Sequence, residues 1–140
     1  MKNSKPKYRV MIADFRFIGS VIVCFVGNDI QELRRKFYSL LKRRKATMTR
    51  QRMQSIFDEV VSMRREAGDH FDGMCLWPTS DRSTPYIWMD EWHLQILVHE
   101  IVHAVSGLMR IKGLEDGRDS EVRAYMTDYA FRIFSNETGK

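Results

Sequence analysis

Cysteine is scarce in this sequence, and long apolar runs are missing from it. The 140 residues include only Cys24 and Cys75, so one disulfide is the most the chain can form. Both cysteines lie in apparent strands, and we favour two buried free thiols in a reducing cytoplasm over a disulfide. The longest apolar stretch, Val21–Val26, has the length of a buried strand, not the roughly 20 residues of a membrane span. The sequence therefore predicts no membrane partner.

The chain also lacks a recognisable secretion signal, internal repeats and low-complexity tracts. Residues 1–7 are basic, but the segment that follows, Val10–Val26, is interrupted by Asp14 and Arg16. Hydrophobic and charged residues make up 44% and 29% of the chain, as in ordinary globular proteins. We therefore expect a single cytoplasmic domain over residues 1–140, with a flexible basic N-terminus at 1–7.

Charge is distributed unevenly along the chain. Residues 1–66 carry 16 Lys and Arg against 6 Asp and Glu, whereas residues 67–140 carry 7 against 12. The first half is thus +10 and the second −5, an asymmetry that can indicate a nucleic-acid partner. The simpler interpretation is that basic residues, such as those at 42–45, form solvated faces and ends of helices. We favour the simpler interpretation and keep a nucleic-acid-associated protein, using its basic first half, as an alternative.

Hydrophobic periodicity predicts four strands and four helices, in the order strand–strand–helix–helix–strand–strand–helix–helix. The strands are expected at 8–17, 21–26, 73–77 and 86–89. The helices are expected to begin at residues that suit helix N-termini, namely Asp29, Thr47 or Thr49, Asp90, and Asp119 or Ser120. This order is typical of an α+β fold with a small, mostly antiparallel sheet packed on helices.

The third predicted helix carries an HExxH motif, His99-Glu100-Ile101-Val102-His103. Residues four apart project from one face of a helix, so His99 and His103 can bind one metal ion. Glu100 lies about 100° around the helix from His99, within reach of a water molecule on that metal. Two imidazoles suit zinc, and a catalytic zinc needs a third protein ligand and one open position. The rest of this helix is apolar, so we expect it to be the core helix.

With this motif the sequence resembles the gluzincin branch of the zincin metallopeptidases in a very reduced form. It is similar to small single-domain HExxH proteins of bacteriophage and bacteria. The resemblance covers residues 73–130 and implies a zincin-like fold. In gluzincins the third zinc ligand is a Glu on the next helix, and Glu121, 18 residues past His103, stands at that position. Three loop residues are rival candidates: Glu115, Asp116 and Asp119.

The sequence departs from the gluzincin pattern after Glu121. The larger gluzincins often carry an Asp four residues after the ligand Glu, where it supports a zinc-bound His, and this position is Tyr125 here. Asp128, on nearly the same helical face as Glu121, is a candidate for that supporting role beside Tyr125. Gly107, four residues past His103, either lets the Glu121 helix approach closely or is a tolerated small residue.

The resemblance implies a zinc-dependent metallopeptidase with one zinc ion and a peptide or protein substrate. His99, His103 and Glu121 would hold the zinc, and Glu100 would act as general base on a zinc-activated water. A substrate peptide would add along the predicted strand at 73–77. The main alternative is a catalytically silent zincin fold that binds metal and acts as an interaction or structural protein. A phage-encoded chain would work in the cytoplasm of its host.

Overall fold

A computed structural model describes residues 9–46, 48–68, 72–78, 83–115 and 117–138. The basic N-terminus at 1–7 and the rival ligand Asp116 lie outside these residues. The chain opens with the predicted hairpin, in which β1 (Arg9–Phe15) and β2 (Ser20–Val26) pair antiparallel. A single 3-10 turn, η1 (Arg16–Ile18), joins the strands and ends at Gly19, whose φ of 65° suits a residue without a side chain.

Two helices follow, α1 (Ile30–Arg43) and α2 (Arg50–Ala67), and both begin where capping side chains were predicted. The carboxylate of Asp29 accepts a hydrogen bond from the backbone N–H of Gln31 at 3.0 Å. The hydroxyl of Thr49 accepts one from the N–H of Arg52 at 3.1 Å. These bonds satisfy N–H groups that the first turn of a helix leaves unpaired.

The remaining strands, β3 (Met74–Leu76) and β4 (Tyr86–Met89), complete a four-stranded sheet in the order β1-β2-β4-β3. The sheet is mixed: β1–β2 and β3–β4 are antiparallel, as expected, whereas β2 and β4 are parallel. The parallel pair arises because α1, α2 and β3 lie between β2 and β4 in the chain and return it in the same direction. The described residues thus form an α+β fold with four strands and four α-helices.

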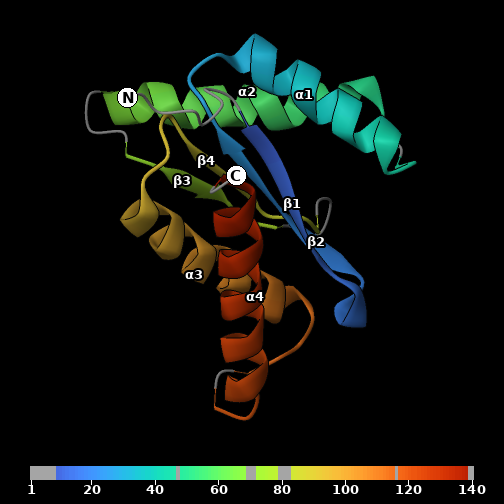
Figure 1. Ribbon diagram of the computed structural model, residues 1–140, viewed down its shortest axis with the longest axis vertical. Coiled ribbons are helices and arrows are strands. Elements are labelled where there is room, and N and C mark those ends of the chain that lie inside the picture. The colour runs from blue at the N-terminus through green and yellow to red at the C-terminus, as the bar shows by residue number, and fades with distance from the viewer. Residues whose placement is uncertain (1–8, 47, 69–71, 79–82, 116, 139–140) are drawn as a thin grey trace.

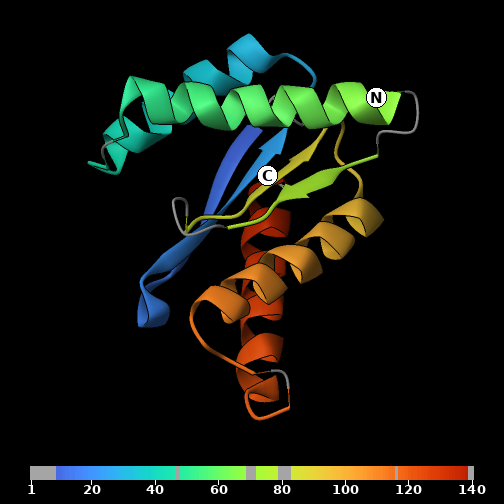
Figure 2. The same ribbon diagram turned by 180° about the vertical axis from the view of Figure 1, so that it is seen from behind.

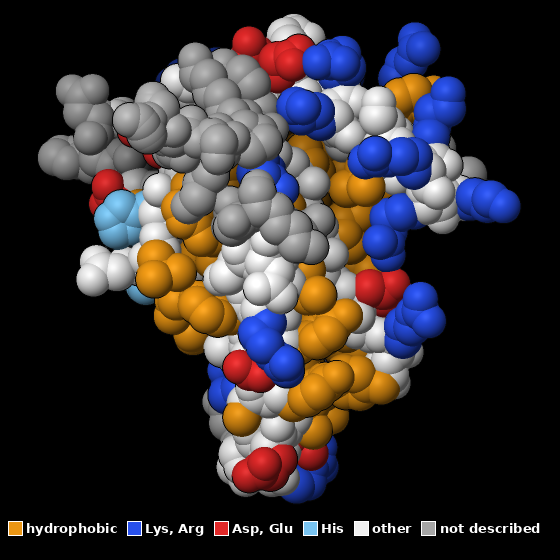
Figure 3. All heavy atoms as spheres, viewed as in Figure 1, with side chains coloured by type: hydrophobic (Ala, Val, Ile, Leu, Met, Phe, Trp, Pro, Cys, Tyr) orange, Lys and Arg blue, Asp and Glu red, His pale blue; other side chains and the backbone are white. Residues whose placement is uncertain are grey.

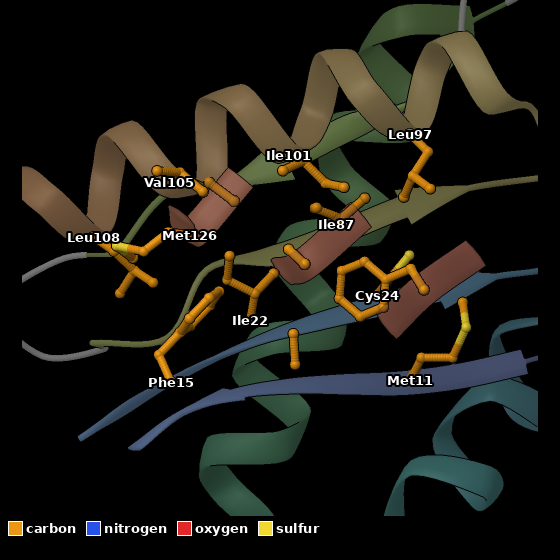
Figure 4. Close-up of a cluster of buried hydrophobic side chains, with 14 of the residues drawn as sticks. Met11, Phe15, Ile22, Cys24, Ile87, Leu97, Ile101, Val105, Leu108 and Met126 are labelled. Atoms are coloured by element: carbon orange, nitrogen blue, oxygen red, sulfur yellow. The ribbon is translucent and has the colours of Figure 1, made fainter. Parts of the chain in front are cut away.

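The helices cover the two faces of the sheet, as Figures 1 and 2 show from opposite sides. Helices α1 and α2 lie on one face, and α3 (Leu94–Ile111) and α4 (Ser120–Thr138) lie on the other. Alternate residues of β2 serve the two layers: Val23 packs with the α1–α2 core, while Ile22 packs with the α3–α4 core. Figure 4 shows the α3–α4 core, where Ile22 and Ile87 of the sheet meet Ile101 and Val105 of α3.

The helix that carries the motif is a core helix, as the sequence predicts. Its 18 residues are long and apolar enough to cross a membrane, yet Leu97, Ile101 and Leu108 are buried against the sheet. The helix starts later than expected, because His93 and not Asp90 is its N-cap residue. Asp90 instead forms an ion pair with Arg64 of α2 at 2.6 Å.

Both cysteines are free thiols on the sheet, as expected. Cys24 of β2 and Cys75 of β3 are each paired in register with Ile87 of β4, which stands between them. Burial, and then the nearby Glu100 carboxylate, raise the pKa of the Cys75 thiol to about 12. Cys75 therefore stays protonated at neutral pH.

Candidate metal centre

The two histidines of the motif lie side by side on the outer surface of α3. Their Nε2 atoms are 3.2 Å apart, and the rings meet edge to face. This separation suits a hydrogen bond between the rings. It also fits zinc, because two nitrogens at about 2.0–2.1 Å from a tetrahedral ion are about 3.3 Å apart. The described residues thus contain two imidazoles whose spacing is compatible with one shared metal ion.

Glu100 occupies the neighbouring face of α3 and is buried, with 7% of its surface exposed. Burial raises the pKa of its carboxyl group, and the two motif histidines oppose that shift in part. A carboxylate is not placed in such surroundings for stability, because removing its charge from water is unfavourable. A general base, however, needs a pKa above that of an exposed Glu.

A pocket of about 570 Å³ joins Glu100 and His99 to the start of β3. Gly73 and Asp72 line the pocket from the segment before β3, and His93 lines it from the N-terminus of α3. Gly73 has a specific role in this packing. A Cβ at that position would collide with the side chain of Ile96 on α3 and lie 3.6 Å from a carboxylate oxygen of Glu100. The missing side chain therefore lets the chain pass close to the motif helix.

The strand next to this pocket is an edge strand. In the sheet order β3 is last, and on its inner side it pairs with β4. A strand was expected at 73–77, and its place at the end of the sheet leaves one side of it open. The Glu100 carboxylate lies near enough to Cys75 of β3 to help raise the pKa of that thiol. The edge strand and the motif therefore lie close together.

The three α4 residues expected near the metal lie on the outer face of that helix. Glu121, Tyr125 and Asp128 are all exposed, and at 100° per residue they fall within one narrow arc. The opposite arc contains Met126 and Ala130, which are fully buried. The apolar stripe of α4 thus turns these three polar residues away from the sheet.

Contacts at the start of α4 explain the position of Glu121. The guanidinium of Arg123 donates a hydrogen bond to the hydroxyl of Ser106 on α3 at 3.0 Å. Residues two apart on a helix point about 200° apart, so the side that faces α3 holds Arg123 and not Glu121. Glu121 as a zinc ligand stays a prediction, and the first turn of α4 must rearrange for it to reach the histidines.

The two supporting candidates have other neighbours. Tyr125 packs edge to face on Phe17 of η1, with ring centroids 5.5 Å apart, and stacks on Tyr129. Asp128 forms an ion pair with Arg132 one turn further along α4 at 2.9 Å. Neither contact involves the motif histidines, although Asp128 also lines a pocket of about 530 Å³ together with Val98 and Ile101 of α3.

The loop residues proposed as rival ligands are held within the loop. Arg118 donates a hydrogen bond to Asp119 at 2.9 Å, and this bond is the main reason that the pKa of Asp119 is lowered. Glu115 forms an ion pair with Arg118 at 3.0 Å. Across the part of the chain that the structure describes, no three His, Cys, Asp or Glu side chains gather closely enough to hold a metal. The site therefore consists of two adjacent histidines and a buried glutamate.

Sequence reasoning missed two features around the motif. His93, to which the sequence analysis assigned no role, caps α3 and also lines the pocket beside Glu100. Gly107 makes room for the loop after β3 and not for α4, since a Cβ there would lie 2.7 Å from Pro78. A small residue such as Gly107 indicates that another segment packs closely against α3, but the sequence does not identify that segment.

Comparison with known proteins adds no assignment. No protein-family model, curated protein or solved structure matches this chain significantly. The function must therefore be argued from the chain's own residues.

Proposed function

We propose that the protein is a zinc-dependent metallopeptidase. The observation that carries this proposal is the pair of imidazoles, with Nε2 atoms 3.2 Å apart, beside the buried Glu100, which lines one pocket with His99. Chance histidines on a solvated helix face do not account for a buried carboxylate next to them. The edge strand β3, which begins directly after the pocket residues Asp72 and Gly73, supports a peptide as the substrate.

His99 and His103 would hold the zinc, and Glu121 is the third ligand that we propose. The donor set of two imidazoles and one carboxylate suits zinc. Bound zinc supplies a Lewis acid that activates water for attack and stabilises the negative charge that develops on the carbonyl oxygen.

Glu100 would move the proton. Its raised pKa lets the carboxylate accept a proton from the attacking water and donate it afterwards to the leaving amine. The fixed backbone of α3 sets the position of Glu100 relative to the histidines, so neither group needs to be ordered when the substrate binds.

The open edge of β3 would hold the substrate. An extended peptide can pair with the free N–H and C=O groups of an edge strand, which binds the backbone whatever its side chains are. The close approach permitted by Gly73 would place such a peptide beside Glu100. This arrangement predicts broad backbone recognition, with sequence preference set by the pocket.

The test compares zinc-loaded wild type with Glu100→Gln on fluorescein-labelled casein and on a mixed peptide library. We expect the variant to keep its zinc while cleavage falls by at least about 100-fold, since a positioned general base contributes that much. Cleavage by Glu100→Gln at the wild-type rate would disprove this mechanism.

A catalytically silent metal-binding fold is the second candidate. The observation that favours it is that the described side chains gather two ligands and a base but no third ligand. The same experiment separates the two functions: stoichiometric zinc without cleavage of any library peptide supports the silent fold.

A further inference from the structure

The layer of α1 and α2 carries a strong positive charge that its own acids do not balance. Residues 30–67 contain 11 Lys and Arg against 4 Asp and Glu. Among the residues described, seven of these cations form no ion pair: Arg34, Lys36, Lys42, Arg43, Lys45, Arg50 and Arg65. Figure 3 shows the blue side chains gathered over this part of the molecule. Such a concentration of charge attracts a polyanion.

A groove of about 600 Å³ lies between α1 and the start of α2. Arg34, Tyr38 and Arg50 line it. Aromatic rings contact one cation that lines the groove, Arg34, and one beside the groove, Lys42. The guanidinium of Arg34 lies 5.9 Å from the centre of the Phe57 ring, and the Lys42 ammonium lies 5.6 Å from that of Tyr38. Glu32 also lines the groove, where its carboxylate is paired with Arg35, so Arg34 and Arg50 leave the groove with a net positive charge.

Tyr38 adds an exposed ring to these charges. It is 55% exposed, although a tyrosine on an amphipathic helix usually turns its ring towards the core. An exposed ring between cations can stack on an unpaired base while the cations contact the phosphates on either side. The bases of a duplex are already stacked on one another and cannot use this ring.

The composition of the surface argues against an anionic membrane as the partner. A helix that binds the membrane interface presents large apolar side chains beside its cations. In the described part of α1 and α2, only Tyr38 and Met63 are large exposed hydrophobic residues, and Met63 lies far along α2 from the groove.

We propose that the groove between α1 and α2 binds single-stranded nucleic acid. Arg34, Lys42 and Arg50 contact phosphates, and Tyr38 stacks on a base. The groove lies on the opposite face of the sheet from α3, so this binding does not depend on the proposed metal site. DNA and RNA share the phosphate and base chemistry that the groove recognises.

The test is fluorescence anisotropy of the full chain with labelled oligo(dT) and oligo(U) of about 20 nucleotides, from about 50 to 200 mM salt. We expect binding that weakens as salt rises. The triple variant Arg34→Gln, Lys42→Gln, Arg50→Gln should weaken binding at least 10-fold and reduce the salt slope by about 2, since each phosphate contact contributes about 0.7. Tyr38→Ala should weaken binding about 5- to 150-fold and leave the salt slope unchanged.

The matched control removes the same charge from the other layer, with Arg110→Gln, Lys112→Gln and Arg132→Gln. It should keep most of the affinity, and circular dichroism should show both triple variants folded. Equal loss in the two triple variants would overturn the proposal, because net charge alone would then explain binding.

Three other results would also overturn it: no binding of either oligonucleotide at the lowest salt, unchanged affinity in Tyr38→Ala, or binding to phosphatidylserine vesicles alone. Unequal binding of oligo(dT) and oligo(U) would support the groove and identify the natural partner as DNA or RNA.

Discussion

Glu100 is the residue whose surroundings the fold alone explains least. It is buried between the motif histidines and the start of β3, where an apolar side chain would be more stable. Burial raises the pKa of its carboxyl, so the folded chain binds this proton more tightly than the unfolded chain. The stability contributed by the protonated form is complete at pH values below the ordinary pKa of Glu and is lost as pH rises through the raised value.

Glu100→Gln should therefore stabilise the protein when metal is removed by a chelator. At pH 7–8 the neutral amide avoids the buried charge, and a gain of roughly 0.5–2 kcal/mol is usual when such a functional group is relaxed. Urea unfolding at pH 5 and pH 8 measures the effect, which should be larger at pH 8. Glu91→Gln, at an exposed position, is the control and should change little. A loss of stability in Glu100→Gln at pH 8 would show that the carboxylate has a structural role instead.

Among the elements, those with strong local signals were predicted well. Asp29 and Thr49 cap α1 and α2 because their side chains reach N–H groups two or three residues away, a relation that the sequence contains in full. Asp90 met the same criterion yet does not cap α3, because Arg64, 26 residues earlier, attracts its carboxylate. A long-range ion pair of this kind cannot be predicted from neighbouring residues.

Gly107→Ala tests how α3 meets the loop after β3. A Cβ at this position would lie 2.7 Å from Cδ and 3.1 Å from Cγ of Pro78, whose ring cannot rotate away. We expect a loss of about 1–3 kcal/mol, more than the roughly 0.5–1 kcal/mol that alanine gains over glycine in a helix. Gly117→Ala is the control, because a Cβ there meets nothing within 4 Å, and it should be neutral. Equal stability of the two variants in thermal unfolding would contradict this packing.

The orientation of α4 decides whether Glu121 is a ligand. Its spacing from His103 supports a gluzincin-like ligand, but the buried stripe of Met126 and Ala130 turns it outward. That stripe is visible in the sequence, so the conflict could have been found before the structure. The spacing of a ligand along the chain does not show which face of its helix packs inward.

Zinc affinity measured by competition with a chromophoric chelator tests this ligand. Glu121→Ala should weaken zinc binding by at least about 10- to 100-fold, the range found even for residues that only support a ligand. Glu66→Ala removes the same charge from an exposed position on α2, on the other face of the sheet, and should keep the wild-type affinity. If the two variants bind zinc equally well, Glu121 is not a ligand, whereas the histidine pair would still stand.

At the scale of the whole molecule, the uneven charge of the sequence becomes a difference between two layers. The first half supplies α1 and α2, and the second half supplies α3 and α4, where residues 90–138 carry 9 Asp and Glu against 5 Lys and Arg. The sheet separates a basic face from the face with the candidate metal centre (Figure 1). The order of elements was predicted correctly, whereas the parallel β2–β4 pair was not, because strand order depends on contacts between distant segments.

The central claim is that His99 and His103 bind zinc, and metal analysis of the purified protein tests it most directly. We predict one zinc per chain in wild type after incubation with zinc and gel filtration, and loss of that zinc in His99→Ala and His103→Ala. His93→Ala is the matched control, since His93 lines the same pocket but is not a predicted ligand, and it should keep its zinc. Stoichiometric zinc in His99→Ala and His103→Ala, or none in wild type, would contradict the account.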